Sequence, residues 1–161
     1  MTSLATLGAD DLRAVMGRFR DALRQHQGDI NRLNVYPVPD GDTGTNMALT
    51  LEAVVTELEG VPAGSGLALV CKAIGHGSLM GARGNSGVIL SQLLRGMCDR
   101  MGVAGSGVDA TVLSDALAHA SDLARRAVVR PVEGTILTVA AAAHFSSYPS
   151  TRPGPITTTS S

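Results

Sequence analysis

The amino-acid sequence predicts an all-α protein, an antiparallel bundle or barrel of helices. Apolar residues recur at steps of three and four in one segment after another, no segment alternates with a period of two, and glycine or proline separates the segments. Of the 161 residues 44% are hydrophobic, but only two are Phe, two Tyr and none Trp. The core must therefore be filled by small side chains at close spacing, which favours packed helices.

The expected helices follow in order along the chain. A first one, after Asp10 and Asp11, should stop near Gly28, with a turn over residues 29–34 and a shaped loop over residues 36–44. Further apolar stripes predict helices within residues 47–58, 67–74, 88–97 and 112–124, and the start of another at residues 136–143. The domain should span residues 8–143, and the Ser/Thr/Pro-rich residues 144–161 should form a disordered tail.

Composition excludes several classes of function. The net charge is -1, without a basic run, and aromatic residues are scarce, so nucleic acid is not an expected partner. No apolar run approaches the roughly 20 residues that span a bilayer, and Cys71 and Cys98 lack the spacing of metal ligands. These observations favour a soluble, cytoplasmic protein with reduced thiols. The four histidines share no spacing with cysteine or carboxylates, which is typical of surface or partly buried helix positions; they are His26, His76, His119 and His144.

A pair of acidic residues marks the first candidate site. Asp40 and Asp42 are separated by one glycine, so both carboxylates can converge on one cation, and carboxylate oxygens suit Mg²⁺. A solvated turn is the structural alternative. A calcium-binding EF-hand is disfavoured, because its fifth, sixth and twelfth positions would here be Gly44, Thr45 and Leu51.

Two glycine-containing segments indicate phosphate binding. Residues 43–47 lie where a helix begins, so backbone N–H groups and hydroxyls could meet an anion, although simple N-capping by Thr43 or Thr45 is an equal reading. Residues 81–87 show the same pattern, and Asn85 or Ser86 is the expected N-cap of the helix that follows. Arg83 either neutralises phosphate charge or is a surface arginine. No Walker-type lysine is present, which excludes a P-loop.

Three segments together resemble a known family. They are residues 34–47, NVYPVPDGDTGTNM; residues 77–92, GSLMGARGNSGVILSQ; and residues 130–139, RPVEGTILTV. They resemble the nucleotide-binding (DhaL-like) domain of the dihydroxyacetone kinase superfamily, over roughly residues 8 to 140. The branch that looks most similar is the ATP-binding subunit of bacterial fatty acid kinase.

The resemblance implies a barrel of antiparallel helices that binds MgATP at one end, with two magnesium ions between aspartates and phosphates. On this chain Asp40 and Asp42 match the metal ligands and the catalytic positions, and Asn34 stands near a further metal position that is aspartate in the dihydroxyacetone kinase branch. The matching nucleotide contacts are Thr43, Thr45, Asn46, Gly81, Arg83, Gly84, Asn85, Ser86, Gly134 and Thr135.

The resemblance also implies that two proteins share the reaction. In similar fatty acid kinases a separate lipid-binding protein presents the acyl carboxylate, so an acyl-binding partner is expected here. The family's barrel continues past the point where this chain becomes rich in Ser, Thr and Pro, so a truncated or frameshifted product with exposed apolar surface is expected. Two functions remain open: an ATP-dependent kinase domain acting on a fatty acid or a small hydroxy-ketone, and a non-catalytic remnant or interaction module.

Overall fold

The computed structural model describes residues 6–35, 38–105, 107–129 and 135–146. Within these ranges the chain forms helices and no strand; the one isolated β-bridge joins Leu7 to Val108. The prediction of an all-α fold is confirmed. The helices are α1 (Ala9–Leu33), α2 (Thr43–Glu59), α3 (Leu67–Gly81), α4 (Gly84–Met101), α5 (Ala110–Arg126) and α6 (Ile136–Ser146).

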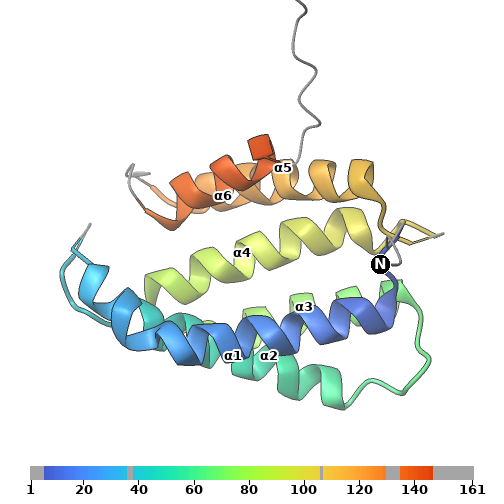
Figure 1. Cartoon of the computed structure of the whole chain (residues 1–161), viewed down its shortest axis with the longest axis horizontal. Helices are drawn as coiled ribbons and strands as arrows, with labels where there is room; N and C mark the ends of the chain where they lie inside the picture. The colour runs from blue at the N-terminus through green and yellow to red at the C-terminus, as the bar shows by residue number, and fades with distance from the viewer. Residues whose placement is uncertain (1–5, 36–37, 106, 130–134, 147–161) are drawn as a thin grey trace, which may run out of the picture.

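Successive helices run in opposite directions (Figure 1). Each helix packs against the next along the chain, and α4 also packs against α2, so that α4 lies between the α1–α3 group and the α5–α6 pair. Because direction alternates, α2, α4 and α6 all begin at the same end of the bundle (Figure 1). The residues predicted to bind phosphate lie at this end.

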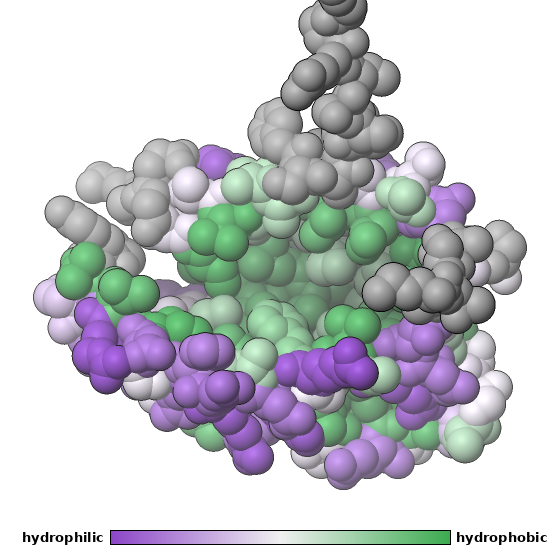
Figure 2. Space-filling model, in the orientation of Figure 1, coloured by the Kyte–Doolittle hydropathy of each residue, from purple (hydrophilic) through white to green (hydrophobic). Residues whose placement is uncertain are grey.

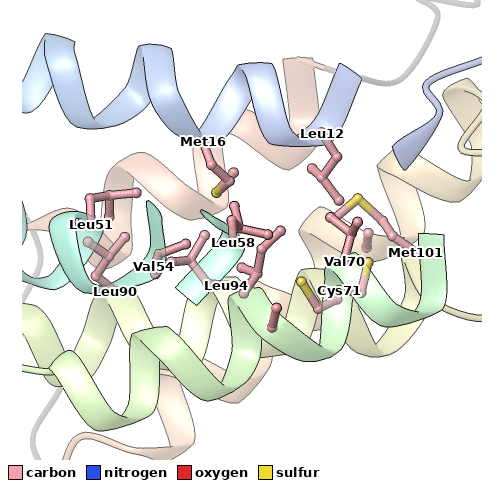
Figure 3. Close-up of a cluster of buried hydrophobic side chains, with 14 of the residues drawn as sticks. Leu12, Met16, Leu51, Val54, Leu58, Val70, Cys71, Leu90, Leu94 and Met101 are labelled. Carbon is pink, nitrogen blue, oxygen red and sulfur yellow. The ribbon is translucent and has the colours of Figure 1, made fainter. Parts of the chain in front are cut away.

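The core is a layer of aliphatic side chains between α2, α3 and α4. Leu51 and Val54 of α2 lie next to Leu90 and Leu94 of α4, and Met16 of α1 covers them (Figure 3). Leu51, Val54, Val70 and Ile74 have no exposed surface. Burying a side chain of this size stabilises the fold by about 1.5–3 kcal/mol, and repetition at helical spacing orients each helix toward the core.

Glycines in α3 and α4 let helices approach closely. A Cβ atom on Gly77 would lie 3.0 Å from Val54 Cα, one on Gly81 would lie 2.1 Å from Ala53 Cβ, and one on Gly96 would lie 2.5 Å from Ala120 Cα. Gly77 and Gly81 lie inside α3, where close packing against α2 offsets their low helix propensity.

Two predicted helix boundaries were wrong, and both affect the site. Residues 29–33 continue α1 instead of forming a turn, because Ile30 packs against the core and Asn31 binds the start of α2. Helix α4 begins at Gly84 with Arg83 as its N-cap, so Asn85 and Ser86 lie inside its first turn and are not the cap. The connection between α3 and α4 is therefore reduced to residues 82 and 83.

One face of the bundle is hollowed and apolar. Figure 2 shows hydrophobic side chains gathered between α6 and α1, and among the described residues α1 packs against neither α5 nor α6. Helix α6 is apolar on all sides, with Leu137 buried but Val139 69% exposed. The open face agrees with the expectation that the first and last helices leave apolar surface uncovered. In the described part of the chain, no helix combines the length and hydropathy needed to cross a bilayer.

Candidate phosphate and metal site at the α2–α4 end

The C-terminal part of α1 holds the start of α2. The side-chain oxygen of Asn31 accepts hydrogen bonds from the N–H groups of Gly44, at 2.7 Å, and Thr45, at 3.2 Å. Its amide nitrogen and that of Gln27 each donate to Thr45 Oγ1 at 3.0 Å. A Cβ on Gly44 would lie 2.4 Å from the carbonyl oxygen of Gln27, so only glycine permits this approach.

This arrangement changes the interpretation of residues 43–47. Two backbone N–H groups that were expected to be free for an anion are already bound by Asn31, which caps α2 from another helix. Neither Thr43 nor Thr45 is the N-cap; Asp42 holds that position, without a side-chain cap bond. Thr45 Oγ1 accepts two hydrogen bonds, and its own hydroxyl proton remains available to an acceptor.

The two aspartates lie on the exposed loop before α2. Gly41 between them has a φ of +67°, a conformation that glycine adopts without strain and that bends the loop tightly. The side-chain amide of Asn34, at the end of α1, donates to Asp40 Oδ1 at 2.5 Å. Both carboxylates are exposed, and Asp42 directly precedes the first residue of α2.

The turn from α3 to α4 lies against the first turns of α2. Gly84 has a φ of +58°, and a Cβ there would lie 2.3 Å from the side-chain nitrogen of Asn46. Fully buried Thr50 donates to the carbonyl of Asn46 at 2.7 Å and accepts from the N–H of Arg83 at 3.3 Å. The two glycine-containing segments predicted to act together are therefore in direct contact.

A further contact joins the helix starts themselves. Ser86 Oγ donates to the carbonyl oxygen of Thr43 at 3.4 Å, which places the first turns of α4 and α2 side by side. The N-cap of α4 provides no side-chain acceptor for the N–H groups of that first turn. Of the two helix starts, that of α4 therefore leaves its N–H groups, at the positive end of the helix dipole, more accessible to an anion. Arg83 is exposed, and its guanidinium donates to the carbonyl of Ala82 at 3.1 Å.

The remaining predicted nucleotide contacts are Gly81, Gly134 and Thr135, and the structure supports them less directly. Gly81 is buried at the end of α3 against Ala53, so its position is explained by packing, and its contact with phosphate stays a prediction. Gly134 lies outside the described residues. Thr135 directly precedes α6, whose first turn lies at the same end of the bundle as those of α2 and α4 (Figure 1), and its Oγ1 accepts from the N–H of Leu137 at 3.4 Å.

The donor set fits a hard cation that brings ligands of its own. Within the described ranges, no three His, Cys, Asp or Glu side chains lie close enough together to hold a metal ion. Asp40 and Asp42 supply carboxylate oxygens from one tight bend, with the amide of Asn34 beside them. Mg²⁺ is commonly bound by one or two carboxylates, with phosphate oxygens and water completing its shell.

Three residues of the site were not identified from the sequence. Gln27 and Asn31 are four apart on α1 and so share a face, but the predicted end of the helix at Gly28 concealed this relation. Thr50 lies within the apolar stripe of α2, where its hydroxyl gave no sign of a partner 33 residues away.

The three histidine side chains that the structure describes lie on helices, exposed or partly buried, each near a carboxylate, as expected. His76 Nδ1 lies 2.9 Å from a carboxylate oxygen of Glu57, and His119 Nε2 lies 3.5 Å from one of Asp99. His26 Nδ1 similarly lies 3.7 Å from a carboxylate oxygen of Asp29 on the surface of α1. The side chain of His144 is outside the described set.

Comparison with known proteins identifies the family. The family model described as the DAK2 domain matches residues 37–149, which include the aspartate loop, the α3–α4 turn and the segment before α6. Uncharacterized proteins of Staphylococcus aureus strains USA300, NCTC 8325 and N315 are each 49% identical over 111 residues. Each match covers 69% of this chain but 20% of the relative, so the chain corresponds to about a fifth of these longer proteins.

The family match covers α2 to α6 of the antiparallel bundle, including the starts of α2 and α4 at the candidate site. The resemblance inferred from three short segments is thereby confirmed at the level of the family. The chain belongs to the DAK2 domain family, the DhaL-like nucleotide-binding domain of the dihydroxyacetone kinase superfamily.

Proposed function

We propose that this chain binds MgATP at the α2–α4 end of the bundle and supplies the γ-phosphoryl group to an acceptor held by a partner protein or domain. The observation that carries the proposal is the contact between two helix starts, Ser86 on Thr43, directly beside a bend that holds Asp40 and Asp42. Anion-binding groups and cation-binding groups thus lie next to each other, as a metal–triphosphate complex requires.

The acidic residues would hold the metal. Asp40 and Asp42 are assigned as ligands and as the catalytic carboxylates, and Asn34 orients Asp40 through its amide hydrogen bond. Two magnesium ions held there would neutralise the negative charge of the phosphates. Because phosphoryl transfer depends mainly on positioning and charge neutralisation, the chain needs no covalent nucleophile of its own.

The phosphates would lie over the first turn of α4. The N–H groups of Gly84, Asn85 and Ser86 are the main donors, with Thr43, Thr45 and Asn46 on the α2 side. Arg83 is exposed at the edge of this surface, where its guanidinium could turn from Ala82 toward phosphate. Gly134 and Thr135 are assigned to the nucleoside side, because α6 begins at the same end.

The acceptor and its carrier follow from the family resemblance. A fatty acid presented by an acyl-binding protein is the first assignment, and a small hydroxy-ketone such as dihydroxyacetone is the second. The same resemblance implies that further domains take part, and the relatives are much longer than the matched segment. An ATP-dependent reaction in a protein with two free thiols also favours a cytoplasmic location.

Calorimetric titration tests nucleotide binding directly. MgATP is titrated into the wild-type chain and into the variants Asp42→Asn and Asp40→Asn, and ATP is also titrated with EDTA present. We expect saturable heat for wild type with magnesium, and affinity lower by about tenfold or more in each variant, because a charged ligand to the metal is lost. Asp29→Asn is the matched control, since Asp29 is also an exposed carboxylate, on α1, and pairs with Arg32.

The outcomes separate the open functions. Heat that survives EDTA and both substitutions would contradict the metal assignment and indicate generic anion binding. The absence of binding heat under every condition, from a protein whose circular dichroism spectrum is still helical, would overturn the proposal in favour of a remnant or interaction module.

A further inference from the structure

A second chemically distinctive region lies away from the proposed nucleotide site. A pocket of about 540 Å³ opens between the first half of α3 and the second half of α4. Its wall includes both cysteines of the chain, Cys71 and Cys98, together with Lys72 and Arg95. Gly75 and Gly102, each four residues after one of the cysteines, also line it.

The two thiols lie on neighbouring helices and line one pocket. Each lies in the protein interior, with 3% of Cys71 and 8% of Cys98 exposed. Interaction with the Cys98 thiol lowers the pKa of Cys71, and interaction with Cys71 together with burial raises the pKa of Cys98. Cys71 lies beside Val70, at the end of the core that also contains Leu12 and Met101 (Figure 3).

We propose that Cys71 and Cys98 are a peroxide-reactive dithiol, which oxidises to a disulfide that joins α3 to α4. Cys71 gives up its proton and its sulfur attacks one oxygen of hydrogen peroxide, which breaks the O–O bond. The departing hydroxide takes the proton to form water, and Cys71 becomes a sulfenic acid. The sulfur of Cys98 then displaces the hydroxyl group, which leaves with the Cys98 proton as a second water. Two thiols are oxidised and one peroxide is reduced.

The pocket explains how a reagent reaches buried sulfur. Hydrogen peroxide is little larger than water, and the cavity that both cysteines line is open to solvent. The side chains of Lys72 and Arg95 are exposed at this pocket, and among the described residues neither forms an ion pair or a side-chain hydrogen bond. Two cations at the pocket would favour the thiolate, the reactive form, whereas the carboxylate of Asp99, which lines the same pocket, opposes it at Cys98.

The backbone is close enough for a bond between the helices. A Cβ on Gly102 would lie 3.2 Å from Cys71 Cβ, so α3 approaches the end of α4 tightly at this level. Cys98 is one helical turn before Gly102 and so lies on the same face of α4, the face that approaches Cys71. The bond would lie near the beginning of α3 and the end of α4, at the opposite end from the first turns of α2 and α4. Oxidation should therefore stabilise the bundle and leave nucleotide binding unchanged.

The test uses the full chain with hydrogen peroxide. Free thiols are counted after denaturation, and a non-reducing peptide map identifies the linked cysteines. We expect the thiol count to fall from two to none, with the α3 and α4 peptides joined within one chain. The thermal midpoint should rise on the order of 5–10 °C and return on adding dithiothreitol.

Single variants make the mechanism testable. In Cys98→Ser the sulfenic acid of Cys71 should accumulate and react with dimedone, whereas Cys71→Ser should react far more slowly because Cys98 keeps its proton. Lys72→Gln and Arg95→Gln should slow oxidation of the otherwise intact pair several-fold. Two free thiols after peroxide, bonds only between chains, or direct conversion of one cysteine to a sulfinic acid would each overturn the proposal. None of these readouts depends on nucleotide binding.

Discussion

Thr50 and Arg83 are joined by a hydrogen bond of 3.3 Å from the backbone nitrogen of Arg83 to Thr50 Oγ1. Thr50 has no exposed surface, and its hydroxyl also donates to the carbonyl of Asn46. One buried hydroxyl therefore fixes the two-residue turn between α3 and α4 against the first turns of α2. The relative position of the two segments proposed to bind phosphate depends on it.

Thr50→Val should destabilise the protein by about 1–3 kcal/mol, because the shape is retained while the N–H of Arg83 loses its acceptor. Urea unfolding followed by circular dichroism measures the effect. Thr56→Val, at an exposed position on the same helix, should change the free energy of unfolding by less than about 0.5 kcal/mol. Equal effects at the two positions would show that the buried hydrogen bonds are not responsible.

Gly84→Ala should weaken MgATP binding and cost about 1–3 kcal/mol of stability. Alanine is strained at a φ of +58°, and its methyl group would displace the side chain of Asn46. Gly64→Ala is the control, since Gly64 also has a positive φ, of +78°, but nothing lies within 4 Å of the added Cβ. The control should lose stability by about 1–2 kcal/mol and bind nucleotide normally. Calorimetry measures MgATP binding by both variants, and thermal melts measure their stability. An equal loss of binding in the two variants would contradict the assignment of Gly84 to the nucleotide site.

Asn31→Ala should destabilise the protein by about 1–2 kcal/mol and loosen the start of α2. The substitution removes the acceptor for the N–H groups of Gly44 and Thr45. Asn31→Asp keeps that acceptor and should recover most of the stability, while the neighbouring exposed Arg32→Ala should have little effect. Hydrogen exchange at the amides of Gly44 and Thr45 is the most direct measurement. Unchanged protection in Asn31→Ala would contradict the capping role.

Gly96→Ala and Gly17→Ala should change stability in opposite directions. A methyl group on Gly96 would lie 2.5 Å from Ala120 Cα, so α4 and α5 must separate, at a cost of about 1–3 kcal/mol. Gly17 lies inside α1 with nothing within 4 Å, so alanine there should stabilise the protein by about 0.5–1 kcal/mol through helix propensity. Thermal unfolding of both variants checks the signs, and destabilisation by Gly17→Ala would show that propensity does not govern that position.

The order and type of the helices could be predicted because each helix carries its own apolar stripe. The stripe of Met47, Leu51, Val54 and Leu58 specifies α2 without knowledge of its partners. The end of α1 could not be predicted in this way. Gly28 indicates a stop, and the interactions that outweigh it, Ile30 in the core and Asn31 on Gly44, come from another helix.

The candidate site shows the same limit. Asp40, Asp42 and Gly84 could be selected from the sequence, because carboxylate pairs and glycines have few other reasons to recur in such a loop. Their supporting residues, Asn31 and Thr50, are polar residues with many alternative roles. Only the packing of α1 and α3 against α2 brings them to the site.

The packing of each helix against the next one along the chain has a consequence for the folding rate. When contacts join segments that are near each other in sequence, little loop entropy is lost before they form, and such helical proteins fold fast. The residues proposed to hold the metal and most of the phosphates all lie between α1 and the first turn of α4. Helix pairs can therefore dock one after another as the chain leaves the ribosome, and this binding surface can be assembled before α5 has been synthesised.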